Sequence, residues 1–100
     1  MRVISLKPLR TFWERHPDAE RPLRHWHRIA IHARWRNLPD VRRAFPHADA
    51  VRTKAGDVLT VFNIGGNKYR LIARIRYDFQ LVNVRHVFTH REYDQRNWTQ

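Results

Sequence analysis

The sequence predicts a single α+β domain spanning residues 1–100, in which two or three N-terminal helices pack on one side of a small antiparallel-rich sheet of about four strands. A short C-terminal helix completes it. Helical periodicity in the first half and strand-like alternation around a glycine pair in the second half indicate this fold class. The third observation is that 42% of the 100 residues are hydrophobic, which is enough to build one compact core.

Composition excludes several classes of protein. No cysteine is present, which excludes disulfide frameworks, thiol catalysis and cysteine-ligated metal sites. No apolar run is long enough for a membrane span or a secretory signal, so we expect a cytoplasmic protein with no membrane association. The 20 Lys and Arg residues against 9 Asp and Glu leave a formal charge of 20 − 9 = +11, which predicts an anionic partner.

The N-terminal half is punctuated by prolines. Residues 2–5 are predicted to form a short strand, and a first helix follows with Pro8 in its first turn. Pro17 ends that helix because proline lacks an amide donor, and a second helix begins near Pro22. Its apolar residues share one stripe by their three-and-four spacing: Leu23, Trp26, Ile29, Ala30 and Ala33.

Short elements and strands follow. Residues 40–45 are predicted to form one or two helical turns with Asp40 as the cap, and Pro46 ends them before a loop that extends to Asp57. The next three segments have strand character and form consecutive antiparallel strands: Val58–Asn63, Lys68–Tyr77 and Gln80–Thr89. Gly65-Gly66 and Asp78-Phe79 connect them as two-residue turns.

Those turn lengths fix the predicted register. They place Phe62, Tyr69 and Phe88 in one row and Thr60, Leu71 and His86 in the next, all on the face toward the helices. The opposite face then carries cations without an intervening carboxylate: Lys68, Arg70, Arg74, Arg76 and Arg85, with Asn83 beside them. We interpret this face as an anion-binding surface, although a one-residue slip in either turn would exchange the faces.

The C-terminal segment combines a helix start with two chemically useful side chains. Thr89-His90-Arg91-Glu92 matches a capping box, so a helix begins at His90. Tyr93 follows three residues later on the same helix face. We therefore expect His90 and Tyr93 to converge with Lys68 and Arg70 at the glycine-turn end of the sheet.

Two longer motifs resemble a known family. Residues 62–71, FNIGGNKYRL, and 84–94, VRHVFTHREYD, resemble the HigB-type toxins of bacterial toxin-antitoxin pairs, a branch of the RelE-like ribonucleases. The resemblance implies a messenger-RNA endonuclease that often acts on ribosome-bound message. It also implies that a HigA-type antitoxin with a helix-turn-helix neutralises the toxin. The toxin would then be associated with operator DNA only through its complex with that antitoxin. The residues that match motif positions are Arg70, Arg85, His90, Tyr93 and Asp94.

RNA carries its own nucleophile, the 2′-hydroxyl, so cleavage needs a base, an acid and positive charge but no metal or cofactor. His90 is predicted to act as general base or acid, and Tyr93 as a donor or proton shuttle. Arg70 would clamp the scissile phosphate, while Arg85 would either bind phosphate or position the backbone. Further RNA contacts are predicted from Lys68, Arg74, Arg76, Lys54 and Asn83.

Three alternatives remain open. A metal-dependent nuclease would use His86 and His90, which have helical ligand spacing, but the sequence shows no acidic cluster for magnesium. A non-catalytic RNA- or DNA-binding module would use the same basic face with tryptophans as stacking partners: Trp13, Trp26, Trp35 and Trp98. A protein that works only through binding its antitoxin is the third. RNA shortening distinguishes the enzyme, because a binding module would protect the RNA instead.

Overall fold

The computed structural model describes residues 1–95 and 97–99. It is an α+β fold built on one sheet with the strand order β1-β5-β4-β3-β2. The strands are β1 (Arg2–Ile4), β2 (Asp49–Arg52), β3 (Val58–Ile64), β4 (Tyr69–Arg76) and β5 (Leu81–Thr89). The helices are α1 (Lys7–Arg15), α2 (Glu20–His32), α3 (Leu38–Ala44) and α4 (His90–Asp94), with 3-10 turns at Pro17–Ala19 and Asn97–Thr99.

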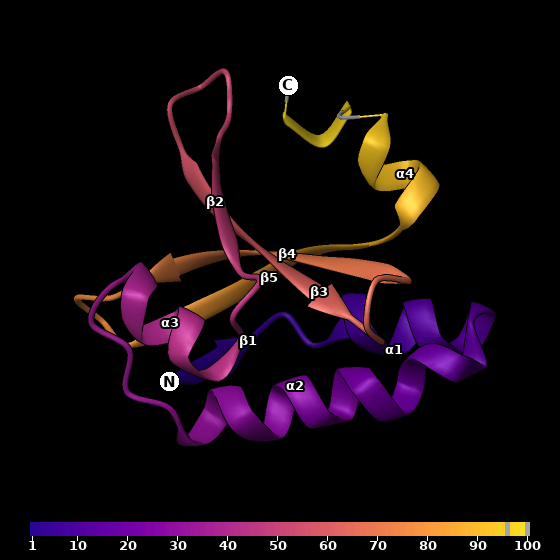
Figure 1. Ribbon diagram of the computed structural model, residues 1–100, viewed down its shortest axis with the longest axis horizontal. Helices are drawn as coiled ribbons and strands as arrows, with labels where there is room; N and C mark the ends of the chain where they lie inside the picture. Colours follow the sequence, from indigo (N-terminus) through magenta and orange to yellow (C-terminus); the bar gives the residue numbers. More distant parts are fainter. Residues whose placement is uncertain (96, 100) are drawn as a thin grey trace.

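The helices divide between the two faces of the sheet. Helices α1 and α2 lie along one face, and α4 rises on the other side from the end of β5 (Figure 1). The main core lies between the sheet and α1–α3, and its fully buried large side chains include Phe12, Leu23, Trp26, Val41, Phe62 and Leu71. A smaller apolar cluster, centred on Leu59, Val61 and Ile72, lies on the other face, which we call the second face. No helix in the described residues is both long enough and apolar enough to cross a membrane.

The N-terminal helices follow the proline punctuation. Pro8 lies in the first turn of α1, which ends at Arg15 just before Pro17. Helix α2 buries the predicted stripe at Leu23, Trp26 and Ala30. In α3 the predicted cap was wrong, because the Asn37 side chain accepts from the Asp40 amide at 3.0 Å and Asp40 is the third residue of the helix.

A fifth strand lies where a loop was predicted. Strand β2 pairs antiparallel with β3 at the sheet edge, with Val51 opposite Leu59. Three of its four residues are exposed, so it lacks the apolar alternation that identifies a half-buried strand. Its pairing partner, rather than its own sequence, determines its conformation.

The glycine turn is longer than predicted. Ile64 pairs with Tyr69, so four residues connect β3 and β4, and Gly65 and Gly66 both have positive φ, at 63° and 70°. Phe62 consequently lies opposite Leu71, not Tyr69. The register moves by two residues, which preserves the face on which every side chain of β3 and β4 lies.

A β-bulge changes the faces within β5. Ala73 pairs with Val84, whereas the preceding Ile72 pairs with His86, which leaves Arg85 without a partner on β4. The bulge inserts one extra residue into β5. From His86 onward, each residue of β5 therefore lies on the face opposite to the one predicted. The prediction that His86 faces the helices was therefore wrong. His86 and Phe88 lie on the second face instead.

Candidate nucleic-acid interface

Arg70 is the central cation of the second face. It pairs with Asn63 and Phe88 in the middle of the sheet and is only 8% exposed. Its Nη1 donates to the carbonyl oxygens of Asn67 at 3.2 Å and Tyr69 at 3.1 Å, and its Nη2 donates to Asn67 Oδ1 at 2.6 Å. A guanidinium has five N–H donors, so Nε–H and one Nη2–H have no partner in the described residues. These two donors suit bidentate binding of a phosphate.

Helix α4 begins at the end of β5, as predicted. The Thr89 hydroxyl accepts from the Glu92 amide at 3.2 Å, and the Glu92 carboxylate accepts from the Thr89 amide at 2.8 Å. This capping box satisfies amide groups that a helix start leaves unpaired. His90 and Tyr93 both lie on this short helix. Because the helix follows β5 without a loop, the end of β5 determines where both residues lie.

Two contacts orient the side chains of His90 and Tyr93 on α4. His90 Nδ1 lies 3.1 Å from Asp94 Oδ2, and the imidazole is about half exposed. A carboxylate that accepts from Nδ1–H leaves Nε2 as the unprotonated nitrogen of the neutral ring. The Arg70 guanidinium carbon lies 5.5 Å from the centre of the Tyr93 ring. Arg70 and Tyr93 therefore meet, as predicted.

A series of rings extends across the second face from Tyr93. Trp98 stacks on Tyr93 with ring centres 5.3 Å apart and lies 6.3 Å from Phe88. Phe88 in turn stacks on His86 at 5.0 Å with nearly parallel planes. Half-burial and the neighbouring Arg85 lower the pKa of His86, which favours a neutral ring at pH 7. Flat, partly exposed rings of this kind can stack on unpaired nucleobases.

Lys68 does not join this group. It lies in the glycine turn, where its Nζ binds Asp18 Oδ2 at 2.9 Å, and the Tyr69 hydroxyl donates to Asp18 Oδ1 at 2.6 Å. Both hydrogen bonds, that from Tyr69 foremost, lower the pKa of Asp18. The predicted convergence of Lys68 with His90 was wrong, because Tyr69 rather than Lys68 is the residue opposite Thr89.

The remaining predicted contacts are spread along the face. Arg74 pairs with Asn83 across β4 and β5, further along the strands from Arg70. Arg76 is bound to Asp78 at 3.0 and 3.2 Å, a contact that raises its pKa. Arg85 is the exposed bulge residue, one position out of the predicted register. The cationic row is thus shorter than predicted and centres on Arg70 and Arg74.

The hairpin of β2 and β3 closes one side of the second face. Its loop meets the C-terminal 3-10 turn, where the Lys54 amide donates to the Thr99 carbonyl at 3.0 Å. Figure 1 shows this hairpin reaching the same level as the chain end beyond α4. The contact places Lys54 beside the segment that carries Trp98.

Sequence reasoning missed three contributors to this site. Asn67, which binds Arg70 twice, sits in the turn whose length was underestimated. His86 and Phe88 reach the second face only because of the bulge, and no local signal in the sequence marks it. No group of three or more metal-ligating side chains occurs in the described part of the chain.

The architecture and the site define a class of protein. It is a small, strongly basic α+β domain whose second sheet face joins a buried arginine, a histidine–carboxylate pair and stacked aromatic rings. Positive charge and exposed rings are the two features that bind single-stranded nucleic acid. These features are those of a nucleic-acid-binding domain, and the same region carries an imidazole at His90 and a phenol at Tyr93.

Comparison with known proteins identifies the family. Residues 19–96 match the family HigB_toxin, described as the RelE-like toxic component of a toxin-antitoxin system. The chain is 30% identical over 94 residues to the mRNA interferase toxin HigB of Escherichia coli strain K12, which covers 94% of this chain and 88% of the relative. The mRNA interferase HigB of Shigella flexneri gives the same values. That of Escherichia coli O6:H1 is 27% identical over 95 residues, or 95% of this chain and 90% of the relative.

The chain belongs to the HigB toxin family. The family model covers most of the chain, and the fold agrees with the resemblance noted in the two motifs. Membership in a toxin-antitoxin family implies an antitoxin as partner. Both motifs contribute residues to the second face, the first through Asn67 and Arg70 and the second through His86, Phe88 and α4.

Proposed function

We propose that the protein is a toxin endoribonuclease that cleaves messenger RNA at the second face. The observation that carries the proposal is the arrangement around Arg70, whose guanidinium keeps two N–H groups without a partner in the described residues and lies 5.5 Å from the ring of Tyr93, on the helix that also holds the His90–Asp94 pair. The relatives named as mRNA interferases support the same conclusion.

The proposed reaction uses the 2′-hydroxyl of the RNA as nucleophile. His90 Nε2 removes its proton, and the 2′-oxygen attacks the adjacent phosphorus as the bond to the 5′-oxygen breaks. The Tyr93 hydroxyl donates a proton to that leaving oxygen, which yields a 2′,3′-cyclic phosphate and a 5′-hydroxyl. Arg70 stabilises the negative charge that accumulates on the phosphoryl oxygens. Each step is supplied by a side chain, so the proposed chemistry needs no metal ion.

The rest of the face would hold the RNA on either side of the scissile bond. Half-buried Arg74 and exposed Arg85 would contact flanking phosphates, with Asn83 on β5 opposite Arg74 and with Arg76, Lys54 and Lys68 at the margins. The ring series from His86 to Trp98 would stack on bases. We further propose that the substrate is ribosome-bound message in the cytoplasm and that a HigA-type antitoxin neutralises the toxin.

End-mapping of a defined message tests the proposal. The purified chain should create new internal ends with cyclic phosphate termini, and any cleavage of naked RNA should persist in buffer with EDTA. His90→Ala should remove those ends. Comparing a translating extract with naked RNA tests the dependence on ribosomes.

The opposite outcome identifies the binding-module alternative. Intact message at protein concentrations that retard RNA on a gel would contradict the proposed cleavage. Cleavage of naked RNA that EDTA abolishes would contradict the metal-independent mechanism while leaving nuclease activity in place; loss of cleavage in the translating extract would not, because EDTA also removes the Mg²⁺ that ribosomes need.

A further inference from the structure

A second basic surface lies away from the Arg70 site. A groove of about 1470 Å³ is formed by β1, the end of α2, the start of α3 and the turn between β4 and β5. Residue 77, where that turn begins, is seven residues along from Arg70, which corresponds to roughly 23 Å at ~3.3 Å per residue. The groove and the proposed RNA site therefore occupy opposite ends of the β4–β5 hairpin.

The charge of the groove is strongly positive. Its lining includes four arginines, Arg2, Arg34, Arg36 and Arg43, against one carboxylate, Asp40. Two arginines of the groove already balance the negative charge of Asp40: Arg36 binds its carboxylate at 3.0 Å, and Arg43 lies 3.7 Å from it. These contacts, chiefly the hydrogen bond from Arg36, lower the pKa of Asp40 and keep it charged. Arg2 and Arg34 are exposed and have no carboxylate partner in the described residues.

The same groove carries uncovered apolar side chains. Ile31 is 41% exposed and Phe79 is 67% exposed, and both line it. Together with Val58 they are the exposed large hydrophobic side chains of the described residues. Exposed apolar side chains rimmed by charge are typical of protein–protein contacts. An aliphatic side chain such as Ile31 offers no ring for a nucleobase to stack on.

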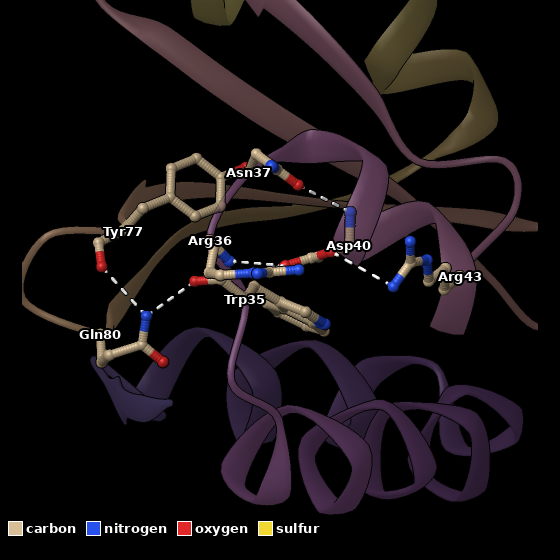
Figure 2. A network of polar contacts seen from close by, with 7 residues as sticks. All are labelled: Trp35, Arg36, Asn37, Asp40, Arg43, Tyr77 and Gln80. Carbon is tan, nitrogen blue, oxygen red and sulfur yellow. Dashed lines mark hydrogen bonds and ion pairs between the residues drawn. The ribbon is translucent and has the colours of Figure 1, made fainter.

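The walls of the groove are held by a polar network (Figure 2). The Gln80 amide nitrogen donates to the carbonyl oxygens of Trp35 at 2.7 Å and Tyr77 at 3.0 Å, which ties the β4–β5 turn to the start of α3. Asn37 caps α3 on the adjoining side. A surface with fixed walls loses little conformational entropy when a partner binds.

We propose that this groove is the docking surface for an acidic segment of the antitoxin, with carboxylates toward Arg2 and Arg34 and apolar side chains against Ile31 and Phe79. Charge complementarity selects the acidic partner, and the exposed apolar side chains select protein over RNA. The inference rests on the proposed control by an antitoxin and is independent of the proposed cleavage chemistry.

Matched charge reversals test the electrostatic half of the proposal. R2E/R34E alters the groove, and R10E/R28E makes the same charge change on the exposed surfaces of α1 and α2. A fluorescent peptide of alternating glutamate and leucine serves as probe, with oligouridylate as the RNA comparison. The groove pair should weaken peptide binding about tenfold or more, and the control pair by less than about threefold. Circular dichroism verifies that each variant is folded.

Apolar substitutions test the other half. I31S/F79S should weaken binding of the same peptide about tenfold, whereas Val58→Ser, at the third exposed site, should leave it unchanged. A version of the peptide with serine in place of leucine should bind I31S/F79S and Val58→Ser with similar affinity. Neither variant should alter binding of oligouridylate by more than about twofold.

Hydrogen exchange on the purified toxin–antitoxin complex locates the partner directly. Protection should concentrate in residues 31–36 and 79–81. Protection confined to residues 86–95, or equal loss of peptide binding in the groove and control pairs, would overturn the proposal. A larger loss of oligouridylate than of peptide in R2E/R34E would overturn it in favour of a second nucleic-acid site. RNA end-mapping is unaffected by these outcomes, so failure of the nuclease proposal would be recognised separately.

Discussion

Arg70→Lys isolates the geometry of the guanidinium from its charge. In the structure three hydrogen bonds to Asn67 and Tyr69 hold the guanidinium, and two N–H groups remain for the phosphate. A lysine ammonium keeps the charge but has three donors on one nitrogen and no planar fork. It cannot keep the three protein acceptors and also bind two phosphate oxygens.

The expected magnitude follows from the lost substrate contacts. Removing one preorganised donor from a charge-stabilising site costs about 2.7–4 kcal/mol in the transition state, or roughly a hundredfold to a thousandfold in kcat. We therefore expect Arg70→Lys to slow single-turnover RNA cleavage about a hundredfold. The free energy of unfolding should fall by only about 1–2 kcal/mol, because solvent can replace the donor at the exposed turn acceptors of Asn67.

The assay compares single-turnover cleavage of a defined RNA by wild type, Arg70→Lys and Arg74→Lys, with urea unfolding of each. Arg74 lies four residues further along the same strand and on the same face, so its substitution controls for general loss of an arginine. It should change the cleavage rate by less than about threefold, through RNA binding alone. Arg70→Lys activity within about threefold of wild type would refute the role of the guanidinium fork.

Three further predictions concern stability. Phe62→Ala removes a fully buried ring packed against Trp26 and should lower the free energy of unfolding by about 3–5 kcal/mol in urea titration. Thr89→Ala removes half of the capping box and should cost about 1 kcal/mol, while Thr89→Ser should retain most of it. The pKa of Asp18 is lowered in the folded state, chiefly by the hydrogen bond from the Tyr69 hydroxyl. The ionised Asp18 therefore stabilises the fold at any pH above 3.8, its ordinary pKa, and this stabilisation is lost as the pH falls through the pKa of the folded state. Asp18→Asn should therefore reduce the acid dependence of unfolding below about pH 4; an unchanged pH profile would contradict that assignment.

The sequence predicted those elements whose signals are local. Pro8, Pro17 and the Thr89–Glu92 box each act on the few residues beside them, so the corresponding helix boundaries agree with the structure. Strand β2 was missed because its conformation depends on pairing with β3 and its exposed residues show no pattern. The cap of α3 was misplaced because Asn37 and Asp40 are both good capping residues.

The candidate site was predicted in part, and the two register errors explain which part. The longer glycine turn shifts β3 against β4 by two residues, an even number, so Arg70 and Arg74 still lie on the predicted face. The same longer turn removes Lys68 from the strand, which leaves its ammonium group with Asp18. Sequence alternation alone does not determine turn length, because four-residue and two-residue turns suit the same glycines.

The bulge at Arg85 has the opposite effect because it adds a single residue. Without it, Phe88 would continue the helix-facing row, where Trp26 and Phe62 already fill the core, and Val87 would lie on the second face. With it, Val87 is buried beneath the sheet and Phe88 lies opposite Arg70, within the ring series that reaches Trp98. One inserted residue thus supplies a small side chain to a crowded core and an aromatic ring to the face that carries the proposed chemistry. Bulges commonly redirect side chains beside active sites, and here the packing of both faces accounts for that change of direction.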